Sequence, residues 1–259
     1  MTSASDILVH GRRDGPVARV ILDDPGRANA LSSAMIEALR GALARAAGDP
    51  ETRVIVLAAE GRVFSAGHDL AELRASDDQA VHQALFDRCS ALMLAIGACP
   101  KPVIARVQGA AVAAGCQLVA SCDLAFAAVE ARFAVSGIDL GLFCSTPSVA
   151  LSRAVGRKAA AEMLFTGRFI GGEEAAALGL INRAVAAGDL DRVIDEAAAA
   201  IAAKAPEAMA LGKALFRRQL ELPAAEAYAL AGEAMAENLS FPSAKAGIDG
   251  FLARRSAAR

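Results

Sequence analysis

The sequence has no tryptophan, one tyrosine and only three histidines among its 259 residues. With few aromatic residues, no basic block and a formal net charge of −2, nucleic acid is not expected as a partner. The histidines are scattered and lack metal-ligand spacing, so no metal site is expected: His10, His68 and His82. The five cysteines form no CxxC pair, which predicts reduced, mostly buried thiols: Cys89, Cys99, Cys116, Cys122 and Cys144.

Long apolar runs are also missing. Apolar residues make up 55% of the chain, enough for a sizeable core, but no run approaches the roughly 18–20 residues that span a bilayer. The first residues, Met1 to Asp6, are polar and lack the basic-then-apolar pattern of a secretory signal. We therefore expect a cytoplasmic protein without a membrane partner.

Strand and helix signals alternate over most of the chain, which predicts an α/β fold. The expected strands are 7–10, 17–22, 54–58, 103–107, 124–129 and 132–135, with helices near 32–43, 81–96 and 113–120 between them. From about residue 146 the pattern is nearly all helical, at 146–155, 157–165, 173–178, 189–205, 206–219, 223–239 and 243–254. We expect a core over residues 1–190 and a helical region over 191–259.

Two segments, 63–70 and 104–118, place small residues where a strand gives way to a helix. Small side chains let a ligand approach the backbone closely, and free N–H groups at a helix start favour negative charge. Two such N–H groups together form an oxyanion hole. The alternative is that the small residues only permit tight packing of strand on helix, and spacing does not decide between the two.

Both segments resemble signatures of the crotonase (enoyl-CoA hydratase/isomerase) superfamily. The resemblance continues, in order along the chain, through residues 24–31, 100–105, 165–168 with 175–179, and 251–255. It implies a spiral of ββα units with a C-terminal helical region used in trimer formation, often as a dimer of trimers. It also implies an acyl-CoA ligand, with no cofactor beyond the coenzyme A of the substrate.

The resemblance assigns roles to particular positions. It implies that the backbone N–H groups of His68 and Ala114 form the oxyanion hole. An imidazole role for His68 is the weaker alternative. It implies that the following residues line the coenzyme A pocket: Arg27, Ala28, Ala66, Asp69, Leu70, Ala71 and Phe251.

Two positions depart from the hydratases of this superfamily, which use two glutamates to hydrate an enoyl thioester. This chain has Gln117 at the first and Gly137 at the second. Glutamine does not exchange a proton near neutral pH, and each missing acid or base typically costs about 10²–10⁴ in rate. Ordinary hydration is therefore doubtful. Residues 113–118 and 141–147 resemble one subgroup more than the hydratases, the enoyl-CoA hydratase domain-containing protein 3 group.

Other residues offer replacements. Asp139, on an extended segment, would share the face of residue 137 and is the first candidate base, with a turn or capping role as the alternative. Ser145 precedes Pro147 and reads as a helix N-cap whose helix end adds positive potential to the pocket, or only caps the helix. Cys144 is a candidate nucleophile without an evident base, and Asp123 is interpreted as structural.

Three functions stay open. The first is an enzyme that uses the oxyanion hole for enolate chemistry other than hydration: isomerisation, decarboxylation or thioester cleavage. The second is a weak enoyl-CoA hydratase. The third is a non-catalytic acyl-CoA binder or regulatory protein, because both acid–base positions lack glutamate.

Overall fold

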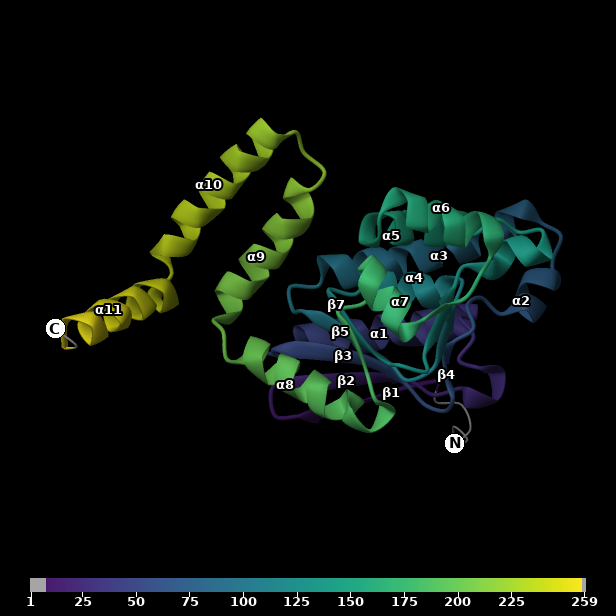
Figure 1. The fold of residues 1–259 in the computed structure, drawn as a ribbon, viewed down its shortest axis with the longest axis horizontal. Helices are drawn as coiled ribbons and strands as arrows, with labels where there is room; N and C mark the ends of the chain where they lie inside the picture. The colour runs from purple at the N-terminus through teal and green to yellow at the C-terminus, as the bar shows by residue number, and fades with distance from the viewer. Residues whose placement is uncertain (1–7, 258–259) are drawn as a thin grey trace.

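The computed structural model describes residues 8–257, so the polar stretch from Met1 to Asp6 and the predicted strand start at residue 7 lie outside it. Two sheets form the core (Figure 1). The larger has the strand order β1 (Val9–Asp14), β2 (Val17–Leu22), β3 (Val54–Ala59), β5 (Val103–Val107), β7 (Leu124–Ala128) and β10 (Arg183–Val185). The smaller has the order β4 (Val63–Ser65), β6 (Ala110–Val112), β8 (Arg132–Ala134) and β9 (Ile170–Gly171).

From β3 to β8, consecutive strands belong alternately to the larger and the smaller sheet. β3 and β4, then β5 and β6, then β7 and β8 each place one strand in the larger sheet and the next in the smaller. Helices α3 (Gln79–Ala98) and α4 (Ala114–Ser121) return the chain to begin the next pair. Since β3, β5 and β7 pair in parallel, as do β4, β6 and β8, every turn repeats the last, and the predicted spiral of ββα units is confirmed.

The larger sheet is covered on both faces. Ile55 and Leu57 of β3 join the main core with α1 (Ser33–Gly48), whereas Val54 and Val56 face α8 (Leu190–Ala202). All six β3 side chains are buried, because the strand is a continuous apolar run and is covered on both faces. The α1 helix starts as predicted, because the Ser32 hydroxyl accepts a hydrogen bond from Met35 N.

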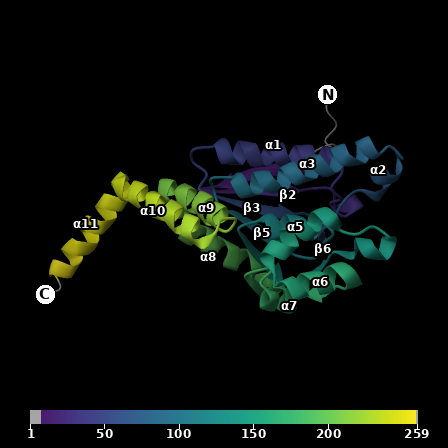
Figure 2. The ribbon, with the colours of Figure 1, turned by 90° about the horizontal axis from the view of Figure 1, so that it is seen from above.

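The last three helices form an arm that projects from the core (Figures 1 and 2). They are α9 (Pro206–Gln219), α10 (Ala224–Ser240) and α11 (Pro242–Ala257), and each packs on the next. Because α8 packs on the sheet, the helices after residue 190 differ in role: α8 covers the core and α9–α11 extend from it. Among residues 8–257, no helix has the length and apolarity that a bilayer crossing requires.

The structure corrects several element predictions. The predicted first strand, residues 7–10, ends too early, because β1 continues to Asp14 and the chain turns at Gly15, where φ is +53°. The prediction of nearly all helix after residue 146 missed β9 and β10, which complete the edges of the two sheets. Short strands such as β4 and β6, each of three residues, are held by pairing with their neighbours, so local composition gave little signal for them.

Candidate functional site

Three predicted segments meet at one edge of the smaller sheet. His68 follows β4, Ala114 follows β6 and Gly137 follows β8. Because β4 pairs with β6 and β6 with β8, all in parallel, the carboxyl ends of the three strands lie side by side. Ala113 N donates to Ala134 O at 2.8 Å, which ties the end of β6 to the end of β8.

Backbone approaches backbone closely at this edge. A Cβ built on Gly67 would lie 2.9 Å from Val112 O and 3.2 Å from Ala114 N. A Cβ on Gly115 would lie 2.3 Å from Ser65 O. Only glycine permits both approaches, so the small residues do support the tight packing that was the alternative interpretation. The same packing brings the chain before His68 against the N–H of Ala114.

The two proposed donor groups are not consumed by internal bonds. Ala114 is the first residue of α4, so its N–H has no partner within the helix. The bridge between Leu31 and His68 uses Leu31 N and Gly67 O and leaves the His68 N–H unused. Within residues 8–257, neither N–H donates a hydrogen bond. Two unpaired N–H groups at neighbouring strand ends can both donate a hydrogen bond to one oxygen atom of a ligand.

Ala113 adopts a backbone conformation that is unusual for alanine. Its φ is +49° and its ψ −115°, and it serves as the N-cap of α4 without a side-chain hydrogen bond. Such a conformation typically costs a non-glycine residue about 1–3 kcal/mol. The strain sets the direction in which α4 leaves β6, and with it the orientation of the Ala114 N–H.

The His68 ring is packed into the protein. Its Nδ1 lies 3.2 Å from Leu31 O, and the ring meets Phe86 edge-on at 5.3 Å between centroids. A carbonyl oxygen only accepts, so Nδ1 carries the hydrogen and Nε2 is left as an acceptor, buried without a partner among the described residues. Burial lowers the pKa of His68, against the opposing effect of its bond to Leu31, so the ring is neutral at physiological pH.

Gln117 lies one helical turn after Ala114. It is 4% exposed, and its Oε1 has no hydrogen-bond partner within residues 8–257. Residues three apart share a helix face, and side chains lean toward the helix N-terminus, so the amide lies on the Ala114 side of α4. Two thiols border this region. Burial raises the pKa of Cys116 to about 12 and also raises that of Cys144.

Residues 136–140 do not form the extended segment that was predicted. They form the 3-10 helix η2 (Ser136–Leu140), in which residues 137 and 139 point to different sides. Asp139 is exposed, and its carboxylate lies against Gly167, where a Cβ would be 2.8 Å from Oδ2. The expectation that Asp139 shares the face of residue 137 is wrong, and its position beside Gly167, which ends α6 (Arg157–Thr166), favours the structural alternative.

The predicted helix cap at Ser145 is also wrong in detail. Helix α5 (Ser145–Ala154) already includes Ser145, its N-cap is Cys144, and no side chain caps it. The Ser145 hydroxyl instead donates to Phe143 O at 3.3 Å. The Cys144 thiol turns back into the loop and accepts from Gly137 N at 3.3 Å.

The loop holding Arg27 and Ala28 lies beside the strand edge. Ala66 N donates to Ala28 O, and Leu31 N donates to Gly67 O at 2.7 Å. Arg27 is exposed and pairs with Asp24 at 2.7 Å and Asp69 at 3.5 Å. Asp69 also accepts from the N–H groups of Ala71 and Glu72, so it is the N-cap of α2 (Leu70–Arg74). Among these positions Ala66, Leu70 and Ala71 are exposed.

Sequence reasoning missed the residue that fixes this loop. Asn29 is fully buried, its Oδ1 accepts from Asp24 N, and its Nδ2 donates to Glu60 O and Val63 O. Ser65, also fully buried, donates to Asn29 O at 2.9 Å. An asparagine in a loop suggests a turn, but only the fold reveals that its amide bonds the carbonyls on either side of the turn between β3 and β4.

Phe251 is not brought to this edge within one chain. It is 58% exposed on α11, in the arm that leaves the core (Figure 1).

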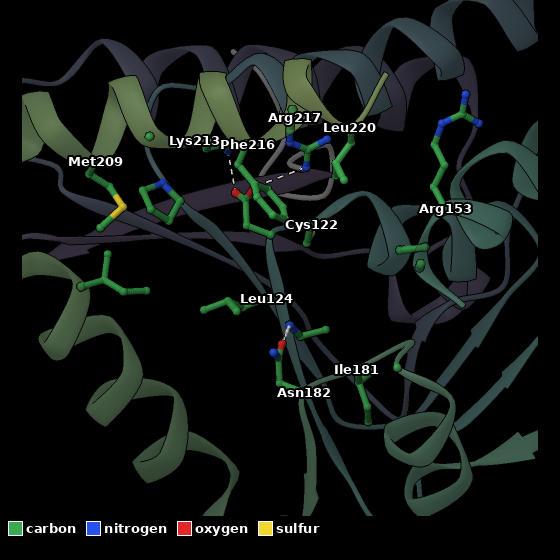
Figure 3. Close-up of a pocket in the computed structure, with 18 of the residues that line it drawn as sticks. Cys122, Leu124, Arg153, Ile181, Asn182, Met209, Lys213, Phe216, Arg217 and Leu220 are labelled. Atoms are coloured by element: carbon green, nitrogen blue, oxygen red, sulfur yellow. Dashed lines mark hydrogen bonds and ion pairs between the residues drawn. The ribbon is translucent and has the colours of Figure 1, made fainter. Parts of the chain in front are cut away.

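A groove of about 1000 Å³ separates α9 from α4, α5 and the ends of β7 and β10 (Figure 3). Asp123 lines this groove and pairs with Lys213 and Arg217 of α9, whose contacts with a carboxylate are the dashed lines in Figure 3. The interpretation of Asp123 as structural agrees with these contacts. All five cysteines are free, and four are buried. Residues 8–257 contain no cluster of three or more metal-ligating side chains.

Comparison with known proteins gives consistent matches. The family model for enoyl-CoA hydratase/isomerase matches residues 12–258. Enoyl-CoA hydratase domain-containing protein 3, mitochondrial, of Rattus norvegicus is 44% identical over 248 residues, which are 96% of this chain and 83% of that protein. A putative enoyl-CoA hydratase of Thermus thermophilus is 36% identical over 93% of this chain and 96% of its own length.

Solved structures agree. An enoyl-CoA hydratase of Mycobacterium smegmatis has a TM-score of 0.94 at 53% identity, covering 95% of this chain and 96% of that chain. The human domain-containing protein 3 has a TM-score of 0.93 at 42% identity, covering 95% and 98%. The relatives from rat, frog, mouse and human are all named enoyl-CoA hydratase domain-containing protein 3, mitochondrial. These names contradict the predicted cytoplasmic location. A polar first stretch does not separate compartments.

Proposed function

This chain belongs to the enoyl-CoA hydratase/isomerase family, and from that premise we propose that it binds acyl-CoA thioesters through an oxyanion hole made by the N–H groups of His68 and Ala114. The supporting observation is the pair of unused N–H groups at adjacent carboxyl ends of β4 and β6. Donors aimed at a thioester oxygen stabilise the negative charge that develops when the thioester becomes an enolate.

The proposed chemistry is enolate chemistry other than hydration. Stabilisation by two backbone N–H groups does not depend on side chains, so it survives the replacement of both family glutamates by Gln117 and Gly137. The same replacements favour a second candidate, a non-catalytic acyl-CoA binder, and leave a weak hydratase as the least supported reading.

For the coenzyme A portion, we propose the surface formed by Arg27, Ala28, Ala66, Leu70 and Ala71. The Arg27 guanidinium is exposed and available to a phosphate, although Asp24 and Asp69 already lie beside it. Asp69 is proposed to act by capping α2 and orienting Arg27.

We also propose a homotrimer or a dimer of trimers. The arm exposes large apolar side chains that its own chain leaves uncovered, among them Phe216, Leu220, Met235, Leu239 and Leu252. We propose that these side chains pack against neighbouring copies, because exposed apolar patches on a protein mark sites of protein–protein contact. Such an assembly is also the proposed route by which Phe251 reaches a coenzyme A site, that of a neighbouring copy.

The test removes one donor. Because Ala114 is the first residue of α4, proline fits the helix there and deletes the N–H. The parent for this variant is Ala113→Gly, since glycine accepts the positive φ at residue 113. Relative to that parent, Ala113→Gly/Ala114→Pro should bind butyryl-CoA about 2–10 times more weakly in calorimetry, the value of one hydrogen bond, and free CoA equally well.

A second readout does not depend on the variant. When butyryl-CoA binds to the wild-type protein, the infrared stretch of its thioester carbonyl should shift to lower frequency, because hydrogen bonds weaken the C=O bond. An unshifted band, or equal affinity of wild-type protein for butyryl-CoA and CoA, contradicts the oxyanion hole.

A further inference from the structure

The position of the second family glutamate is closed to any side chain. A Cβ built on Gly137 would lie 2.4 Å from Leu142 O and 2.8 Å from Cys144 Sγ, both inside the closest approach of real Cβ atoms. Gly137 is also bonded on both sides, since its O accepts from Leu142 N at 2.9 Å and its N donates to Cys144 Sγ. The backbone carbonyl of Leu142 and the thiol of Cys144 therefore fill the space that a side chain at residue 137 would need. We call these two groups the wall.

The Cys144 thiol of this wall, the Cys116 thiol near it and the Gln117 amide of α4 are all uncharged at neutral pH. The Gln117 amide does not titrate, and burial raises the pKa values of Cys116 and Cys144, which keeps both thiols protonated. The carboxylate of Asp139 points to Gly167 instead. Neither family acid–base position offers a group that can take a proton from a bound thioester.

The absence of a base at both family positions affects the three enolate reactions differently. Isomerisation begins with removal of a proton by a base, and thioester cleavage by water needs that water activated. Loss of CO2 from a carboxyl group on the α-carbon needs no base, because the electron pair of the broken bond itself forms the enolate.

We propose that the ligand of this site is a 2-carboxyacyl thioester, which the protein decarboxylates between the oxyanion hole and the neutral wall formed by Leu142 and Cys144, with the uncharged Gln117 amide one helical turn after Ala114. This inference rests on the proposed function, because the enolate needs the N–H groups of His68 and Ala114.

The reaction balances without a further cofactor. The bond between the α-carbon and the carboxylate carbon breaks, and its electrons form the carbon–carbon double bond of the enolate, whose charge lies on the thioester oxygen. CO2 departs, and solvent water gives a proton to the α-carbon. The products are the acyl thioester and, from CO2 and the remaining hydroxide, bicarbonate.

The wall also favours this reaction energetically. A carboxylate held against uncharged groups, among them the buried Cys144 thiol, loses hydration, and departure of neutral CO2 relieves that cost. Gln117 can turn either its Oε1 or its Nε2 toward the carboxylate and so hold its plane. A glutamate at 117 would instead repel it.

The test is a panel of malonyl-CoA, methylmalonyl-CoA, butyryl-CoA, crotonyl-CoA and 3-butenoyl-CoA in D2O, read by mass spectrometry. The 2-carboxyacyl thioesters should lose CO2 and gain one deuterium at the α-carbon, faster than crotonyl-CoA is hydrated or 3-butenoyl-CoA is isomerised. Gln117→Glu should slow decarboxylation at least about tenfold through charge repulsion. The exposed control Gly188→Ala, where an added Cβ meets nothing, should leave the rate unchanged.

The outcomes separate the two proposals. No CO2 loss above a protein-free control, with butyryl-CoA still bound more tightly than CoA, overturns the decarboxylation and keeps the oxyanion hole. Faster hydration or isomerisation, or a Gln117→Glu variant as fast as wild type, also overturns it. Equal binding of butyryl-CoA and CoA overturns both.

Discussion

Lys213 fastens the helical arm to the core, and replacing it with methionine should destabilise the protein strongly. It is 9% exposed, and its Nζ donates to Asp123 Oδ2 at 2.6 Å, to Ile96 O at 3.1 Å and to Lys101 O at 3.0 Å. Methionine keeps most of the apolar stem but none of the donors. The variant therefore leaves one carboxylate and two carbonyls short of a partner.

The structure sets the size of the effect. Removing one partner of a buried ion pair typically costs about 3–5 kcal/mol. Asp123 keeps Arg217 at 3.3 Å and Val103 N at 2.8 Å, which places Lys213→Met at the lower end, about 3 kcal/mol. For a chain of this size, a loss of 1 kcal/mol lowers the Tm by about 2–4 °C, so a fall of roughly 6–12 °C is expected.

The assay is thermal unfolding followed by circular dichroism at equal protein concentration, because assembly would make the Tm concentration-dependent. Lys204→Met is the matched control, because this exposed lysine lies two residues after the end of α8 and has no ion pair within residues 8–257. If Lys213→Met melts within about 1 °C of Lys204→Met, the buried contacts do not hold α9, and the reasoning is refuted.

Two further substitutions test the backbone of the site. Gly137→Ala should lose about 1–3 kcal/mol, because its Cβ overlaps Leu142 O, while Gly188→Ala should melt as wild type does; equal melting of the two would mean that position 137 has room for a side chain. Ala113→Gly should gain up to about 1 kcal/mol, since relief of the positive-φ strain outweighs the added entropy of the unfolded chain, and a lower midpoint in urea unfolding would show that Ala113 is not strained.

Much of the fold could be read from local patterns. The apolar run of β3, the strand Val17–Leu22, the Ser32 cap and the helices of the arm follow from periodicity and capping, which neighbouring residues encode. The small residues around 67 and 114 also identified the strand-to-helix turns of the site. These features depend on residues that are close together in the chain, so they can be predicted from the sequence alone.

The tertiary structure decided what local patterns leave open. Parallel pairing of β4, β6 and β8 sets three distant segments side by side, and the role of Asn29 depends on carbonyls more than thirty residues away. At 137 the sequence shows a glycine, but only the folded turn shows that Leu142 O fills the space of a side chain. Such contacts join residues through space, and no spacing along the chain encodes them.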